Sequence, residues 1–216
     1  MLVTPRDLPD LPYASHLEPF RGALERDGDY EGAHLDGGSF EDIDGGSIRF
    51  SESALTSVVF AAGRMRRARF HDVWMHTVRW VATDMAETNW MDVEINAASL
   101  AGLELFSSQM RRVTFHNCKL DSVNLRAATL QDVTFSDCLL RDVDFAGAKL
   151  QDVTFPGSTL DDVQFAKAQM KKVDLRSATH LGITDGIDAL KGATIDTAQM
   201  ADFAPMMAQA LGIVVK

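Results

Sequence analysis

The sequence predicts an all-β solenoid, in which one chain winds into a stack of similar coils. The main observation is a large apolar residue at every fifth position from Tyr30 to His180, a series of 31 positions that only Gly45 and His180 interrupt. A five-residue period fits neither an α-helix nor an alternating strand. It therefore indicates a coil with a regular number of five-residue units per turn.

A second repeat sets that number at four. The segment 131–135, with the sequence QDVTF, recurs unchanged at 151–155, and the close variant RRVTF occupies 111–115. If a coil has twenty residues, residues twenty apart stack about 4.8 Å apart, as neighbouring strands do. We therefore expect Phe115, Phe135 and Phe155 to form an aromatic stack inside the solenoid.

The composition of each unit identifies a family. The residue two places before the large apolar one is small or β-branched, as in the segments 128–130 (Ala-Thr-Leu), 143–145 (Val-Asp-Phe) and 173–175 (Val-Asp-Leu). This pattern resembles the pentapeptide-repeat family over about 150 of the 216 residues. The resemblance implies a right-handed quadrilateral β-helix with four units per coil. The chain departs from the family unit in one respect. Asp or Asn directly before the large apolar residue is uncommon here, and an acidic residue often stands three places before it instead.

A stack of this kind has two open ends, which need caps to prevent edge-to-edge aggregation. We expect residues 1–29 to form an N-terminal cap segment, residues 30–180 the repeat β-helix, and residues 181–216 a helical C-terminal cap. Asp196 or Thr197 can N-cap a helix over 198–203. Pro205 suits the first turn of a second short helix, and 213–215 look like a final strand.

The C-terminal segment carries an apolar face that either packs on the last coil or joins two copies of the chain. Its last residues are similar to the C-terminal end of the quinolone-resistance pentapeptide-repeat proteins, which implies a tail-to-tail homodimer. The residues predicted for that interface are Met200, Phe203, Met207, Leu211 and Ile213.

Composition narrows the class of partner. The chain has 21 basic and 31 acidic residues, a net charge of -10, which argues against direct binding to nucleic acid. No stretch approaches a membrane span and no signal peptide is apparent, so we expect a cytoplasmic protein.

The two cysteines, Cys118 and Cys138, become inward neighbours on successive coils. They form either a redox or metal pair or, as we favour, two buried thiols in the small-residue column.

No catalytic constellation is apparent in the sequence. No Ser, His and acid stand out as a triad, and no glycine-rich phosphate loop follows a strand. We therefore predict a non-enzymatic protein without cofactor or metal. The histidines are expected at the surface, except His180, which ends the core column.

One outward column of residues twenty apart is mostly acidic. Like charges in neighbouring strands destabilise a sheet, so we interpret this column as a partner-binding surface. Its carboxylates are Glu52, Asp72, Asp92, Asp132 and Asp152, and its cations are Arg112 and Lys172.

Two functions are open. The resemblance to quinolone-resistance proteins implies an acidic rod that mimics DNA and binds a type II topoisomerase (DNA gyrase or topoisomerase IV), modulating it or protecting it from inhibitors. The alternative is a structural scaffold or interaction module with an unrelated partner. A DNA mimic needs negative charge spread along the rod and across the dimer junction, whereas a scaffold would show one localised apolar or mixed patch.

Overall fold

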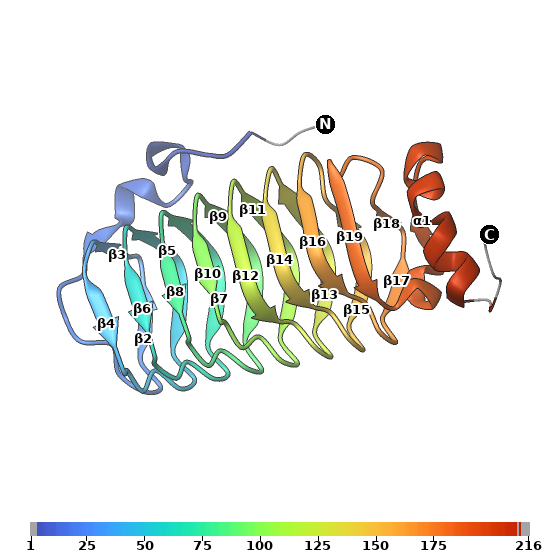
Figure 1. Ribbon diagram of the computed structural model, residues 1–216. Coiled ribbons are helices and arrows are strands. Elements are labelled where there is room, and N and C mark those ends of the chain that lie inside the picture. The colour runs from blue at the N-terminus through green and yellow to red at the C-terminus, as the bar shows by residue number, and fades with distance from the viewer. Residues whose placement is uncertain (1–3, 211, 213–216) are drawn as a thin grey trace.

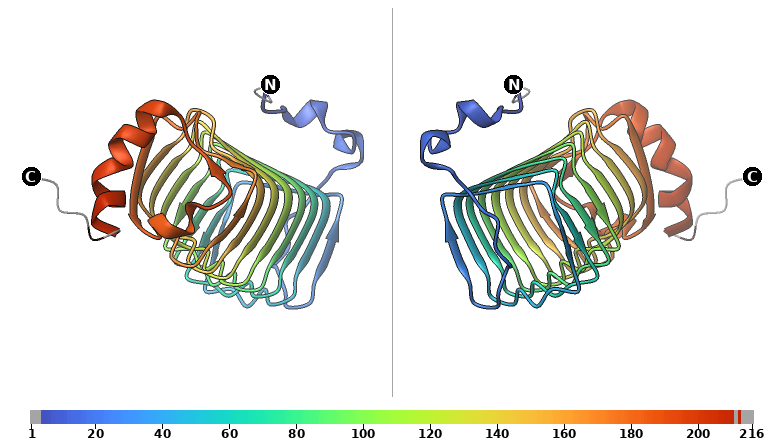
Figure 2. Two further views of the ribbon diagram at one scale, coloured as in Figure 1. Left: turned by 90° about the vertical axis from the view of Figure 1, so that its right-hand side faces the viewer. Right: turned by 90° about the vertical axis from the view of Figure 1, so that its left-hand side faces the viewer.

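The computed structural model describes residues 4–210 and 212 and confirms the predicted fold class. The chain forms a parallel β-solenoid of about eight turns with one C-terminal helix. Figure 1 shows the coils stacked along one axis, with the described N-terminal segment over one flank and the helix against the last coils. Figure 2 shows the four-sided outline of the coils from both ends.

The strands form two sheets. The first sheet contains β1 (Glu18–Pro19), β2 (Asp29–Glu31), β3 (Ala33–Asp36), β5 (Arg49–Thr56), β7 (Arg69–His76), β9 (Asn89–Asn96), β11 (Gln109–His116), β13 (Thr129–Ser136), β15 (Lys149–Thr154), β17 (Gln169–Lys171), β18 (Val173–Asp174) and β20 (Ala193–Thr194). The second contains β4 (Ser39–Glu41), β6 (Val59–Ala61), β8 (Arg79–Val81), β10 (Ser99–Ala101), β12 (Lys119–Asn124), β14 (Leu139–Asp144), β16 (Thr159–Gln164) and β19 (His180–Asp185). Neighbouring strands are parallel, and from β4 to β18 their register is twenty residues, as in Phe115↔Phe135 and Leu120↔Leu140.

The corners of the coil are made by left-handed backbone at a fixed place in every unit. All thirty positions at five-residue intervals from 27 to 172 have φ between 44° and 74°, and 25 of them are not glycine. Left-handed backbone crowds Cβ, and Asp and Asn tolerate it better than most residues. Asp is accordingly the most frequent residue at these corners, with nine instances.

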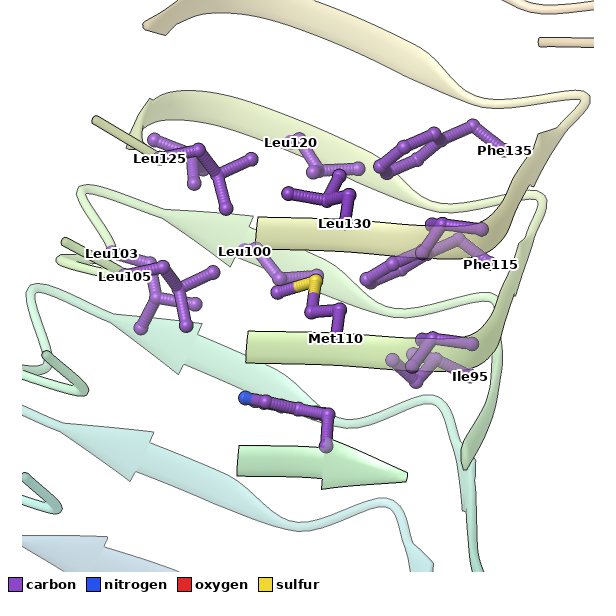
Figure 3. Close-up of a cluster of buried hydrophobic side chains, with 14 of the residues drawn as sticks. Ile95, Leu100, Leu103, Leu105, Met110, Phe115, Leu120, Leu125, Leu130 and Phe135 are labelled. Carbon is purple, nitrogen blue, oxygen red and sulfur yellow. The ribbon is translucent and has the colours of Figure 1, made fainter. Parts of the chain in front are cut away.

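The interior is filled by the five-residue series and the small residues beside it. Phe115, Phe135 and Phe155 form the expected stack, with ring centroids 4.8 and 5.2 Å apart. Figure 3 shows leucine, methionine and phenylalanine side chains of successive coils in columns. A second stack joins Tyr30, Phe50, Phe70 and Trp90, so the core continues through most of the length of the solenoid.

The N-terminal segment lies across the outside of the solenoid before it enters the first coil. It contains two short 3-10 helices, η1 (Leu8–Asp10) and η2 (Ala14–His16). Leu11 and Tyr13 are buried against the outward side chains of Ala54 and Trp74. The segment then pairs β1 with β3 and places Leu24 in the main core.

The C-terminal segment ends the stack with η3 (Ile187–Leu190), β20 and α1 (Thr197–Ala210). Asp196 caps α1 as predicted, because its carboxylate accepts the N–H of Gln199 at 2.9 Å. The expectation of two helices separated at Pro205 is wrong, since α1 continues through this proline. Phe203 and Met207 on either side of Pro205 pack on the core, which holds the two halves in line. The predicted strand at 213–215 lies outside the described residues.

Candidate partner-binding surfaces

The acidic column lies along one corner of the solenoid. Its carboxylates lie within strands of the first sheet, at positions that all have left-handed backbone, for example φ 44° at Glu52 and 55° at Asp132. The backbone therefore gives Asp at these positions a structural reason of its own. Repulsion between the like charges of the column is therefore weaker evidence for a partner-binding surface than the sequence alone suggests.

The column neutralises part of its own charge. Arg112 binds Asp92 through two side-chain hydrogen bonds, and this contact lowers the pKa of the Asp92 carboxyl below its usual range. Lys172 lies 3.5 Å from a carboxylate oxygen of Asp152. Among the described residues, Glu52 and Asp132 make no ion pair, and both are exposed.

His71 joins the same corner. Its Nε2 lies 3.2 Å from a carboxylate oxygen of Asp72, and side-chain ligand atoms of His71, Asp72 and Asp92 lie within 4.8 Å of one another. Three such groups can bind a cation in principle, but the guanidinium of Arg112 already contacts both oxygens of Asp92. The arrangement is best described as an ion-paired corner.

Negative charge is concentrated at the N-terminal end. Residues 1–49 contain eleven acidic and four basic residues, whereas residues 50–180 contain sixteen acidic and fifteen basic ones. The body of the solenoid is therefore almost neutral. The first coil and the segment before it carry most of the net charge of -10.

The N-terminal segment is fixed to the solenoid by polar contacts that the sequence reasoning missed. The backbone N–H and the Nε–H of Arg6 both donate to the carboxylate of Glu94 at 2.7 Å, and the indole N–H of Trp74 donates to the carbonyl of Arg6 at 3.0 Å. The sequence contains one indication of this contact, a departure from a repeated column. The same outward column has threonine at 114, 134 and 154, so Trp74 and Glu94 depart from it.

Two histidines differ from the expectation. His180, expected to end the core column, is exposed, and His116 lies in a row of buried polar residues beside Glu94. His116, expected at the surface, is 2% exposed, and its neighbours Asn96 and Ser136 are also buried. Strands β9, β11 and β13 continue through the corner, so these side chains stack on one another. Burial lowers the pKa of His116. Within the described part of the chain, its Nε2 and the Oδ1 of Asn96 have no hydrogen-bond partner.

The predicted dimer residues are divided between core and surface. Phe203 is buried and Met207 packs on the core, so both belong to the C-terminal cap. Met200 is exposed by 47%. Leu211 and Ile213 lie outside the described residues.

The two cysteines lie in the core as expected for buried thiols. Cys118 and Cys138 are both free and buried, and the N–H of Cys118 donates to the sulfur of Cys138 at 3.4 Å. The contact with the Cys118 side chain, and then burial, raise the pKa of the Cys138 thiol, which makes it a poor nucleophile.

No helix within the described ranges is long and apolar enough to cross a membrane.

Comparisons with known proteins agree with the repeat pattern. The family model described as a pentapeptide repeat region matches residues 88–165 and 108–182. No curated protein sequence matches the chain.

Among solved structures, a trypsin-treated variant of QnrB1, a plasmid-mediated fluoroquinolone resistance protein, is 13% identical with a TM-score of 0.38, over 90% of this chain and all of that one. HetL, a pentapeptide-repeat protein of the cyanobacterium Nostoc involved in heterocyst differentiation regulation, is 17% identical with a TM-score of 0.35. That match covers 79% of this chain and 90% of HetL. Likenesses at this level do not indicate a partner.

Proposed function

The chain belongs to the pentapeptide-repeat family, and we propose that it is a non-enzymatic acidic rod that binds the DNA-binding surface of a type II topoisomerase, DNA gyrase or topoisomerase IV. In this role it mimics DNA and modulates the enzyme or protects it from inhibitors. It needs no cofactor and no nucleic acid. The proposal places the protein in the cytoplasm, where such enzymes meet DNA.

The observation that supports this proposal is the outward column of carboxylates along one corner. Neighbouring positions of the column are one coil, about 4.8 Å, apart on a rigid support, and Arg112 occupies the position between Asp92 and Asp132. DNA presents its phosphates at comparable regularity along its axis. Glu52 and Asp132 carry the unpaired charge of the column, and Asp72, Asp92 and Asp152 complete it.

The distribution of charge adds a second contact region. Because residues 1–49 hold most of the negative charge, the N-terminal coil is the part of the rod that a basic surface attracts most strongly. We therefore propose that this end contacts the enzyme together with the corner column.

We also propose that two copies join through their C-terminal ends. The exposed Met200 lies on α1 beside the cap formed by Phe203 and Met207. A tail-to-tail pair would place the two acidic N-terminal ends at opposite tips of a longer rod. Sedimentation velocity of the wild type and of Met200→Glu tests this: the wild type should sediment as a dimer and the variant as a monomer.

The test of the enzyme-directed role is a DNA gyrase supercoiling assay with increasing protein, with and without a fluoroquinolone. One variant changes the corner (Glu52→Gln, Asp72→Asn, Asp132→Asn), and another changes the first coil (Asp36→Asn, Glu41→Gln, Asp42→Asn). A matched control removes charge from a later coil (Asp161→Asn, Asp162→Asn). Inhibition or drug protection by the wild type and the control, lost in the corner variant, is the expected result.

The alternative is an interaction module with an unrelated partner, and the near-neutral body of the solenoid favours it. Sixteen acidic and fifteen basic residues between 50 and 180 do not reproduce the charge of DNA along the rod. Absence of any effect on gyrase or topoisomerase IV, at concentrations well above that of the enzyme, would replace the first proposal with this one.

A further inference from the structure

The strand β4 has a free edge at the N-terminal end of the solenoid. It is the last strand of the second sheet, and within the described part of the chain it pairs only with β6 (Figure 1). The N–H of Val59 donates to the carbonyl of Gly38 at 3.0 Å, and the N–H of Asp42 donates to the carbonyl of Ala61 at 2.9 Å. The backbone groups of the even-numbered residues therefore face β6.

Alternate residues of a parallel strand direct their backbone groups to opposite sides. The N–H and C=O groups of Ser39 and Glu41 consequently point away from the stack. Both residues are exposed. No described residue bonds to these groups, which therefore form a short row of donors and acceptors to which a further strand can add.

The other half of the first coil is closed in a way that β4 is not. The N–H of Glu18 donates to the carbonyl of Gly32, and that of Phe20 to the carbonyl of His34, both at 2.8 Å. The ring of Phe20 packs on Tyr30 at a centroid distance of 5.0 Å. The chain thus supplies its own strand, β1, above β3, and none of its described residues forms a strand above β4.

The side chains at the edge define what could occupy it. Phe40, which stacks on Phe60 at 5.4 Å, is only half-buried, and so is Ile43. Asp36, Glu41 and Asp42 surround them, are exposed, and make no ion pair with any described residue. The edge therefore combines a small apolar strip with three exposed carboxylates, of which that of Glu41 accepts a hydrogen bond from the Ser39 hydroxyl at 3.3 Å.

We propose that the free edge of β4 is a docking site for an extended, basic segment of a partner protein, which adds as a further strand. Such strand addition uses backbone hydrogen bonds for affinity and side chains for specificity. A second copy of this chain is a poor occupant, because its own edge would bring carboxylates against carboxylates. Lysine or arginine on the added segment instead pairs with Asp36, Glu41 and Asp42.

Side chains of a strand point alternately to its two faces, and this alternation predicts the sequence of the docked segment. Every second side chain would cover Phe40 and Ile43, and the residues between them would point outward to the carboxylates. A run in which apolar and basic residues alternate satisfies both faces. The inference does not depend on a topoisomerase being the partner, so a negative gyrase assay leaves it in place.

The first experiment uses the full chain and a labelled synthetic peptide of sequence KVKVKVK. Backbone amide exchange is followed by NMR, and the peptide is expected to slow the Ser39 and Glu41 amides by about tenfold or more. The same peptide with N-methylated backbone amides keeps the charge but cannot pair, and should not bind. Equal binding of the methylated peptide, or protection at another part of the chain, would overturn strand addition at β4.

A pair of variants separates the backbone contact from charge. Glu41→Pro removes an outward N–H, and the hydrogen bonds to β6 remain. The next residue, Asp42, has left-handed backbone with φ 51°, and proline is common directly before such a residue in a turn. We expect Glu41→Pro to keep its thermal midpoint and to weaken peptide binding about tenfold or more, and Glu41→Gln to weaken it less. Equal loss in the two variants would show that charge alone holds the peptide, and would overturn the proposal.

Discussion

Arg6 contacts Glu94 across 88 residues of sequence, through both its backbone N–H and its guanidinium. Asn96 donates to the same carboxylate at 3.1 Å. The side chain of Glu94 is only 8% exposed, and Arg6 and Asn96 supply the hydrogen bonds to its nearly buried carboxylate. This one contact joins the segment to the middle of the solenoid.

Arg6→Ala is expected to loosen the N-terminal segment and destabilise the protein. The variant leaves a buried carboxylate without its cation, a loss of about 1–3 kcal/mol in the free energy of unfolding, toward the lower end because Arg6 is about half exposed. Urea unfolding measures it. Arg21→Ala, at an exposed arginine, is the control. A double variant with Glu94→Gln should recover part of the loss, and additive losses would contradict the contact.

The buried His116 predicts a decrease in stability in mild acid. Burial lowers its pKa in the folded state, although Glu94 and Asp137 act in the opposite direction. Stability is therefore complete above the unfolded value of about 6.5 and is lost as the pH falls through the folded pKa. Urea midpoints between pH 8 and pH 5 test this. His116→Gln should flatten the dependence in this window, and His180→Gln, at an exposed histidine, should leave it unchanged.

The core was predictable because burial repeats with the chain's own period. Phe115, Phe135 and Phe155 recur at intervals of twenty residues, and a coil of that length stacks them inside. The N-terminal segment was not predictable in the same way, because Arg6 and Trp74 belong to no repeat and meet only in three dimensions. Pro205 misled the helix prediction because local propensity was outweighed by the packing of Phe203 and Met207.

Phe135→Ala is expected to be severely destabilising. Phe135 is fully buried between Phe115 and Phe155, and truncation leaves a cavity in the middle of the stack. Losses of about 3–5 kcal/mol are typical of such changes. Thermal or urea unfolding measures the loss. Phe106→Ala removes the same group from a side chain that is 44% exposed and should cost far less. Similar losses in the two variants would place Phe135 outside the core.

The acidic corner was found from the sequence, but its physical cause was not. An acidic residue three places before one large apolar residue is also two places after the previous one, as Asp132 is for Phe135 and Leu130. That position requires left-handed backbone, which periodicity alone does not reveal. The ion pairs that neutralise Asp92 and Asp152 likewise depend on side-chain geometry. The sequence therefore located the corner and overstated its free charge.

Substitutions at Asp132 separate backbone from charge. Asp132→Asn removes the charge and keeps a residue suited to φ 55°, so we expect unchanged stability and weaker binding to a basic partner. Asp132→Val forces a β-branched residue into left-handed backbone, with an expected loss of about 1–2 kcal/mol in the free energy of unfolding. The control is Gln131→Val, because Gln131 lies in the same strand, β13, without left-handed backbone, and valine is favoured there. Urea unfolding of the three variants decides the matter. If Asp132→Asn proved as unstable as Asp132→Val, the carboxylate itself would hold the corner, and the column could not be treated as a surface free for a partner.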